Sequence, residues 1–498
     1  MRALFAGIFV FLVLTFTGCG GSSGGNDSDT QPSPDLLFPT IEFWGEEVKY
    51  RTFEGAARTS VTSVTQDQKG NLCYIIQEAS LDDITISPSH WQTTVECRDK
   101  SGETYFHLER SGTGVFKQVM FIPGGRFIVA ELIDATSEIN TSGYFLRLTL
   151  YSSAGHQLQR SLLTDPPGED ELYFYTFTGT GASGNDQSIN SDQTNNGVTR
   201  DFMPELSFDN IPVLFDTATV KLVWKDNALS LLAYTYGVKV YRFNDQLEQL
   251  WNHQVMPAHP WLWVSSLNNK ADLSVSDDGE IFVAFEVLGD ETKAYEWHFG
   301  RSLDKTSEDR DIAVSVYGVD GQYLRSFIVG NADNHESLAG MFYRDSSLWF
   351  GANVRRHKFD QPNYTTEWDL LLIETTADSG ITLQYHFIDH KDEDFANVFI
   401  PLPNGNVLFG GITGFKQVDS NSLTGNGSGL LLEVSASGEI QQKALLREPR
   451  HVGIESVSIA ESNYVLFSGI YDAPITHTCD QDGSLCYQKS MAGKAQLN

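Results

Sequence analysis

The sequence predicts an all-β protein, and two observations support that prediction. Beyond Pro39, apolar and polar residues alternate with a period of two in short segments, and helical periodicity is scarce. Glycine, asparagine and aspartate separate these segments, as they do at the turns of β-hairpins. The chain of 498 residues is 12% aromatic and 20% charged, a composition that favours a packed core over disorder.

A hairpin of one kind recurs seven times. In the clearest copy an alternating segment reaches a turn at Asp277, Asp278 and Gly279, and an apolar run over 281–285 follows. The seven turns are centred on Gly70, Gly125, Asn227, Gly279, Ser346, Gly405 and Asn463. After six of them a longer polar loop leads to a second hairpin, with its turn at 99–102, 153–155, 244–245, 320–321, 378–380 or 437–438. Each of these six units therefore has four predicted strands.

The repeat length indicates a ring. Successive first turns lie 52 to 67 residues apart, except for one interval of 102 residues. A four-stranded unit of this size has two apolar faces, and it buries both only by stacking between two neighbours. The sequence therefore predicts a seven-bladed β-propeller over residues 39–498.

Two features concern the closure and the size of this ring. The last unit ends after three strands, and segment 42–53 alternates Val48, Tyr50 and Phe53, so we expect an N-terminal strand to complete the last blade. The long interval contains segment 164–217, rich in glycine, asparagine, serine and aspartate, which predicts an insertion. An eighth blade is the alternative, because the interval is about twice one unit.

The repeats resemble those of a known bacterial family. The run Gly405-Asn406-Val407-Leu408-Phe409 and segment 430–438 are similar to propeller repeats of the SBBP type, over about residues 57–498. The resemblance implies a fold. Because propellers serve as lyases, hydrolases, oxidoreductases and binding scaffolds, it transfers no catalytic residue.

The N-terminus predicts export. Residues 1–18 contain one charge at Arg2, an apolar run over 3–16 and the small residues Thr17 and Gly18 before Cys19. The segment resembles a bacterial lipoprotein signal, which implies acylation of Cys19, for example with palmitate. Gly20 in place of aspartate implies the outer membrane, and residues 19–38 are typical of a flexible tether. An ordinary cleaved signal peptide with an incidental cysteine is the alternative.

The charge balance excludes some partners. With 65 acidic and 34 basic side chains the formal net charge is −31, which disfavours nucleic acid and anionic lipid. Since no other segment is apolar enough to span a bilayer, we expect membrane contact through the N-terminal lipid alone.

Four cysteines follow Cys19. Their positions in the predicted strands and loops favour two local disulfides, Cys73 with Cys97 and Cys479 with Cys486. A zinc site is the alternative, although the spacing lacks paired C-x-x-C motifs.

The long loops within blades, such as segment 413–428, and the connectors between blades are expected on one face, here called the long-loop face. Four histidines fall in successive connectors and suggest a divalent transition-metal site at the channel mouth, namely His259, His335, His390 and His451. Chance placement of twelve histidines is the alternative, because the four are not register-equivalent.

Other side chains on this face suggest ligand binding. Trp261 and Trp263 are candidate stacking platforms for sugar rings, or else pack between blades. A basic group is a candidate anion site, or else pairs with nearby acids, and it comprises Arg355, Arg356, His357 and Arg450. The sequence therefore favours an envelope-anchored module that binds a protein or glycan without catalysis and without a cofactor. A metal-assisted lyase or hydrolase acting on an acidic polysaccharide is the alternative, and no catalytic residue is assigned.

Overall fold

The computed structural model describes residues 50–53, 58–79, 91–111, 114–134, 144–163, 219–234, 238–256, 270–287, 310–331, 334–356, 368–389, 393–419, 422–424, 427–446, 451–460, 464–473 and 489–496. Within these segments every regular element is a β-strand. None of them contains a helix long and apolar enough to cross a membrane.

The strands form seven antiparallel sheets. Blade 1 consists of β2 (Arg58–Gln66), β3 (Leu72–Ala79), β4 (Trp91–Arg98) and β5 (Thr104–Ser111). Blade 2 consists of β6 (Gly114–Ile122), β7 (Arg126–Asp134), β8 (Tyr144–Tyr151) and β9 (Gln157–Leu163). Blade 3 consists of β10 (Thr219–Lys225), β11 (Ala228–Tyr234), β12 (Val238–Phe243) and β13 (Gln249–Met256). Blade 4 consists of β14 (Ala271–Val275), β15 (Ile281–Val287), β16 (Asp311–Tyr317) and β17 (Tyr323–Val329).

The remaining blades follow the same order. Blade 5 consists of β18 (Asn334–Arg344), β19 (Ser347–Arg356), β20 (Trp368–Thr376) and β21 (Thr382–Ile388). Blade 6 consists of β22 (Glu393–Pro401), β23 (Val407–Asp419), β25 (Ser428–Val434) and β26 (Ile440–Leu446). Blade 7 consists of β27 (His451–Ile459), β28 (Tyr464–Ala473), β29 (Lys489–Gln496) and β1 (Tyr50–Phe53).

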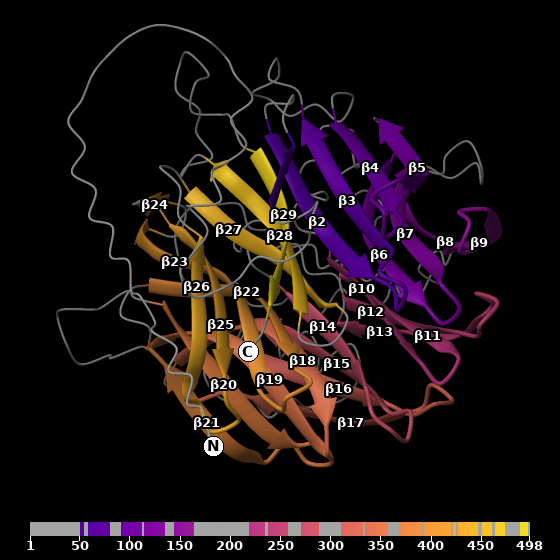
Figure 1. Cartoon of the computed structure of the whole chain (residues 1–498). Helices are drawn as coiled ribbons and strands as arrows, with labels where there is room; N and C mark the ends of the chain where they lie inside the picture. Colours follow the sequence, from indigo (N-terminus) through magenta and orange to yellow (C-terminus); the bar gives the residue numbers. More distant parts are fainter. Residues whose placement is uncertain are drawn as a thin grey trace, which may run out of the picture.

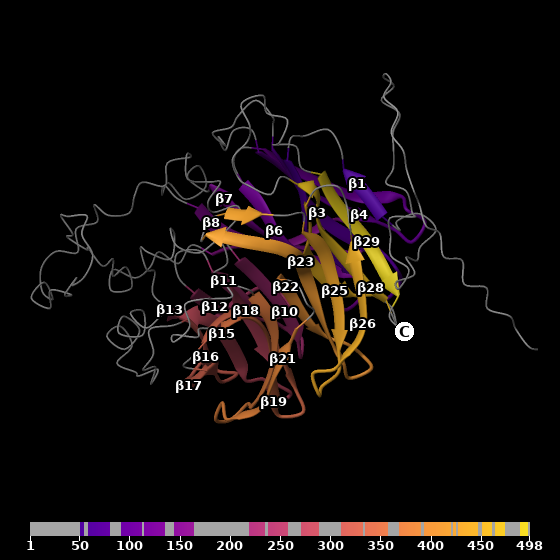
Figure 2. The same ribbon diagram turned by 90° about the vertical axis from the view of Figure 1, so that its left-hand side faces the viewer.

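The N-terminal strand closes the ring as predicted. β1 pairs antiparallel with β29, with Tyr50 opposite Gly493 and Phe53 opposite Ser490. Figure 1 shows the yellow strands of blade 7 beside the indigo β2 of blade 1, and Figure 2 shows β1 beside β29. The first and last parts of the chain therefore share one sheet, which removes a free edge from blade 7.

The core is divided among the junctions between blades. Seven apolar clusters of the described residues each join two adjacent blades, and together they run around the whole circle. For example, Val61 and Tyr74 of blade 1 pack with Leu466 and Ala492 of blade 7. Each sheet thus buries both faces, which is the physical reason why the units form a closed ring.

The structure decides between seven blades and eight. Blade 2 packs directly on blade 3 through Leu148, Leu222 and their neighbours. The backbone N–H of Leu222 also donates to Gln118 Oε1 of blade 2 at 2.6 Å. No blade therefore lies between them, and the ring has seven blades. The predicted insertion at 164–217 lies outside the described residues.

One predicted loop has strand structure instead. Part of segment 413–428, expected to be a long loop, continues β23 to Asp419 and turns back as β24 (Ser422–Thr424). Figure 2 shows this hairpin projecting from blade 6. The strand therefore extends past the glycines into the predicted loop.

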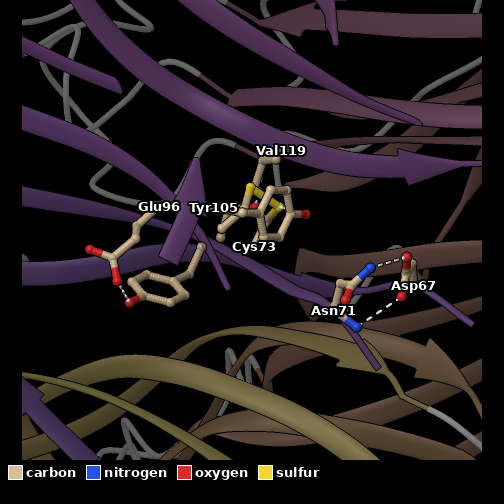
Figure 3. The surroundings of a disulfide bond; sticks show 9 residues. Asp67, Asn71, Cys73, Glu96, Tyr105 and Val119 are labelled. Carbon is tan, nitrogen blue, oxygen red and sulfur yellow. Dashed lines mark hydrogen bonds between the residues drawn. A yellow bond between two sulfur atoms is a disulfide. The ribbon is translucent and has the colours of Figure 1, made fainter. Parts of the chain in front are cut away.

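The disulfide between Cys73 and Cys97 confirms one predicted pair. The two cysteines lie directly opposite each other in β3 and β4, with Cα atoms 4.1 Å apart. Figure 3 shows the bond near Tyr105 and beside Val119 of blade 2, in the apolar cluster between blades 1 and 2. The bond therefore cross-links two strands of blade 1 within the core between blades 1 and 2. The predicted pair Cys479 and Cys486 lies outside the described residues.

We expect reduction of this bond to lower the free energy of unfolding by about 3 kcal/mol, because it frees a loop of 24 residues in the unfolded chain. Urea unfolding of the Cys73→Ala/Cys97→Ala variant measures the change. An unchanged midpoint would show that the bond adds nothing to stability.

A turn glycine provides a second stability test. Gly380 has a φ of +68°, and a Cβ at this position would lie 2.2 Å from Cδ2 of Phe327 in blade 4. Gly405 has a φ of +88°, and a Cβ added there would meet no atom within 4 Å, so it is a matched control for backbone strain alone. We expect Gly405→Ala to cost about 1 kcal/mol of unfolding free energy, and Gly380→Ala to cost about 1–3 kcal/mol more. Equal losses of unfolding free energy for Gly380→Ala and Gly405→Ala in chemical denaturation would contradict the close contact between Gly380 and Phe327.

Candidate functional site

The innermost strands surround the axis of the ring. The first strand of each blade, β2, β6, β10, β14, β18, β22 and β27, contacts the first strands of both neighbouring blades. Each of these strands begins at the end of the ring where the predicted connectors enter, which is the long-loop face. Their first residues therefore form the described part of the channel mouth.

Five of the seven innermost strands contain a β-bulge near their middle, farther along the channel from this mouth. The ladder shifts by one residue at Thr62, Lys117, Ala339, Asn397 and Glu455. A bulge leaves one residue out of the pairing and changes the direction of its side chain. Three of the five residues have ionisable or amide side chains, so the bulges introduce polar groups into strands that otherwise pack as core.

Lys270 connects blades across the ring. It immediately precedes β14 of blade 4, and its Nζ donates to the carbonyl oxygen of Asn397 in blade 6 at 2.9 Å and to Asn397 Oδ1 at 3.1 Å. The amide of Asn397 donates in turn to the carbonyl oxygen of Ile454 in blade 7 at 3.0 Å. Blade 5 lies between blades 4 and 6 in the ring order, so the lysine reaches past it near the axis.

The surroundings of Lys270 combine burial with negative charge. Burial lowers the pKa of Lys270 to about 8, and the charges of Glu286, Glu455 and Asp272 oppose this change. Loss of hydration disfavours the ammonium, whereas three carboxylates favour it. The result is an amine that is easier to deprotonate than an ordinary lysine.

Glu286 links blade 4 to blade 5 through hydrogen bonds. Its Oε1 accepts hydrogen bonds from Ser337 Oγ and the Leu338 backbone N–H of β18, both at 2.8 Å. Its Oε2 accepts from Arg310 Nη1 at 2.9 Å, and the Glu286 side chain is 3% exposed. Burial raises the pKa of Glu286, and the Arg310 charge and the hydrogen bond from Ser337 oppose that rise.

Asp272 joins three blades. Its Oδ1 lies 3.2 Å from Lys221 Nζ of blade 3, and its Oδ2 accepts from the Met341 backbone N–H of blade 5 at 2.7 Å. The backbone N–H of Leu273, within blade 4, donates to Oδ1 at 2.8 Å. The carboxylate therefore bonds the innermost strands on both sides of its own.

A carboxyl pair lies between blades 4 and 5. Glu336 is fully buried, and its Oε1 accepts from Tyr385 OH at 2.8 Å and from the Asn331 backbone N–H at 3.2 Å. Burial raises the pKa of Glu336 to about 9, and both the charge of Asp311 and a hydrogen bond with it add to the rise. At neutral pH the Glu336 carboxyl therefore keeps its proton.

The structure describes only part of the predicted histidine set. His335 lies within β18 and not in a connector, and its Nδ1 accepts a hydrogen bond from the Arg310 backbone N–H at 3.1 Å. His451 begins β27, but its side chain, like the whole of His259 and His390, lies outside the described residues. Among the residues that are described, no group of three or more His, Cys, Asp or Glu side chains is placed to hold a metal ion. The four-histidine site stays a prediction, which metal analysis of the purified protein would test.

The structure also describes only some of the predicted binding residues. Arg355 and Arg356 end β19, opposite His335 and Asn334 of β18, so they extend a strand where a loop was expected. The side chain of Arg356 and the positions of Trp261, Trp263, His357, Arg450 and Cys19 lie outside the described residues.

Sequence reasoning missed Lys270, Asp272, Glu286 and Glu336. A signal exists for three of them, because Lys270, Asp272 and Glu286 stand beside or near the ends of mainly apolar strands. Such residues at the end of a buried strand are usually paired. Their partners could not be identified, since Lys270 and Asn397 are 127 residues apart in the chain.

Comparison with known proteins finds distant structural similarity only. No family model matches the chain, and no curated protein matches it. A protein of unknown function from Bacteroides caccae is similar in structure, with a TM-score of 0.32 and 8% identity over 70% of this chain and 94% of that chain. A europium-containing methanol dehydrogenase has a TM-score of 0.38 and 10% identity over 87% of this chain and 81% of that chain. The quinohemoprotein alcohol dehydrogenase of Comamonas testosteroni has a TM-score of 0.37 and 8% identity over 93% of this chain and 81% of that chain. Likeness at this level carries no argument about activity.

Proposed function

We propose that the protein is an exported, lipid-anchored binding module of the bacterial envelope, built from SBBP-type propeller repeats. It engages an envelope protein or a glycan through the long-loop face. Cys19 carries the lipid, and the outer membrane is the proposed location. Its proposed role is binding, without catalysis.

Two observations of different kinds support export. The N-terminal segment has a charge, an apolar run and small residues before Cys19. Cys73 and Cys97 form a buried disulfide, and disulfides persist in oxidising compartments outside the cytoplasm.

A binding role is supported by the hydrogen bonds and ion pairs that the charged side chains at the channel mouth form within the protein. Lys270 bonds to Asn397, Glu286 to Arg310 and Ser337, and Asp272 to Lys221 and Met341. These bonds make the mouth rigid, and the bonded groups serve to hold neighbouring parts of the ring together. A rigid ring that gathers loops on one face suits recognition.

Two experiments test the proposal. Labelled palmitate is expected in the wild-type protein and not in Cys19→Ala, which should appear in the soluble fraction. Equal labelling of both would overturn the lipid anchor. Pull-down from solubilised envelope is expected to lose its partners in Trp261→Ala/Arg356→Ala, and unchanged recovery would overturn binding through these residues.

A further inference from the structure

A buried arginine of blade 3 has fewer partners than a buried charge ordinarily has. Arg242 lies in β12 and is 4% exposed, and Ser230 of β11 stands opposite it. Arg242 Nη1 donates to Ser230 Oγ, and among the described residues this is the one hydrogen bond of the guanidinium. A guanidinium has five N–H donors, and burying a cation without a counter-ion is costly. Arg242 therefore has donors that the described part of the chain does not satisfy.

The other charged residues at this position have a partner on the outer strand. In blades 3, 5 and 6 the outer hairpin has a bulge directly after Arg242, Glu374 and Glu433, respectively. Gln384 Nε2 donates to Glu374 at 2.8 Å, and Gln442 Nε2 donates to Glu433 at 2.5 Å. Each glutamine lies directly opposite its glutamate, so the outer strand neutralises the polar group in these two blades.

The outer strand of blade 3 offers no such partner. Trp251 lies directly opposite Arg242, and its indole nitrogen is a donor only. That nitrogen donates to the carbonyl oxygen of Val319 in blade 4 at 2.9 Å. Because the Trp251 side chain has no atom that accepts a hydrogen bond from the guanidinium, Arg242 is the charged residue of the three that its outer strand leaves unsatisfied.

One acid acts on Arg242 from a distance. Asp226 stands in the exposed turn between β10 and β11, and no ion pair joins these two described side chains. Burial lowers the pKa of Arg242, and the charge of Asp226 opposes this change. Asp226 therefore favours the cation without bonding to its donors.

The guanidinium reaches the surface of the protein. Several polar side-chain atoms of the described residues are fully buried without a hydrogen bond, including Arg325 Nε, but no nitrogen of Arg242 is among them. The nitrogens that Ser230 does not bind therefore contact solvent. Since β12 runs from the long-loop face to the turn at 244–248, Arg242 lies near the opposite face, here called the short-turn face.

The chemistry of these groups favours a small carboxylate. Two parallel N–H groups of a guanidinium match the two oxygens of a carboxylate. Ser230 Oγ accepts from Arg242, so its O–H is left to donate to the same anion. Asp226, Asp245 and Asp320 are exposed in the neighbouring turns, and they repel a polyanion or a dianion more strongly than a single negative charge.

We propose that Arg242, together with Ser230, binds the carboxylate of a small acid at the short-turn face of blade 3. The ligand is a simple carboxylic acid or a sugar acid, since both present the same group. It supplies the negative charge that the outer strand of blade 3 lacks. Because the site lies at the other end of the ring from the long-loop face, it does not depend on the proposed binding role of that face.

Saturation-transfer difference NMR with acetate and with glucuronate, at constant ionic strength, tests the proposal on the purified protein. The matched variants are Arg242→Gln and Arg126→Gln, which remove the same charge from the short-turn face. Arg126 is the more exposed of the two, and it has no acidic partner among the described residues. We expect Arg242→Gln to weaken acetate binding about tenfold or more, and Arg126→Gln to change it little. Tighter binding of glucuronate than of acetate would support a sugar acid, and equal binding would support a simple acid.

Four results would overturn the proposal. The first is an absence of binding of both acids, and the second is equal binding by Arg242→Gln and the wild type. The third is equally effective competition by chloride, which indicates a site without preference for carboxylates. The fourth is acetate binding that appears only in Asp226→Asn, because Asp226 then fills the site in the wild type. Thermal melts establish that the variants are folded, and acetate should raise the Tm of the wild type but not that of Arg242→Gln.

Discussion

Replacing Glu286 by alanine is expected to lower the free energy of unfolding by about 3–5 kcal/mol. The substitution leaves Arg310 without its buried partner and removes the acceptor for Ser337 and for the backbone N–H of Leu338. All of these groups lie between blades 4 and 5, where water cannot easily replace the carboxylate. Urea denaturation of the purified variant measures the loss.

Two further variants test whether the loss of stability depends on the charge of Glu286 and on its burial. Glu286→Gln keeps an acceptor oxygen and loses the charge, so we expect a smaller loss than with alanine. Glu280 pairs with Arg325 at 2.7 Å, but both side chains are about one-third exposed. Glu280→Ala should therefore cost no more than about 1 kcal/mol. Similar losses for Glu280→Ala and Glu286→Ala would contradict the role of burial at this junction.

Stability is expected to fall as the pH rises from 5 to 8, in part because of Glu336. Burial raises the pKa of this carboxyl from 4.5 to about 9, so the folded chain keeps a proton that the unfolded chain releases. The contribution is complete below about pH 4.5 and is lost as the pH approaches 9. One proton corresponds to a slope of at most about 1.4 kcal/mol per pH unit.

Glu336→Gln isolates this contribution. The amide oxygen can accept from Tyr385, and the amide N–H can donate to Asp311, without any titration. Thermal melts across the range should therefore show a shallower decline for the variant than for the wild type. Lys270 acts in the opposite direction, because its pKa is lowered to about 8 and its contribution grows only above that pH. Parallel pH profiles for variant and wild type would contradict the raised pKa of Glu336.

Much of the ring could be predicted from local sequence signals. Turns at Gly70, Gly279 and Gly405 adopt positive φ values, as the hairpin pattern predicts, and Asn227 does so without a glycine. The disulfide followed from two cysteines opposite each other in adjacent strands. The N-terminal closure followed from a last blade that lacked one strand.

The polar mouth could not be predicted in the same way. Its contacts join residues far apart in the chain, such as Lys221 with Asp272 and Asp272 with Met341. They depend on how blades rotate against one another and on bulges such as the one at Asn397, which shift a ladder by one residue. Strand periodicity carries no information about either feature.

The central claim is that the channel mouth is part of the framework of a binding protein and not a reactive centre, and Lys270 tests it most directly. An amine with a pKa near 8 would be the fastest of the lysines to acylate if reagents could reach it. Limited acetylation of the folded protein at about pH 8, followed by mass spectrometry, compares it with the exposed Lys100. The bonds of Lys270 to Asn397 predict slower modification than at Lys100, and equal rates only after unfolding. Faster acetylation of Lys270 in the folded protein would contradict the account and identify the mouth as a site of covalent chemistry.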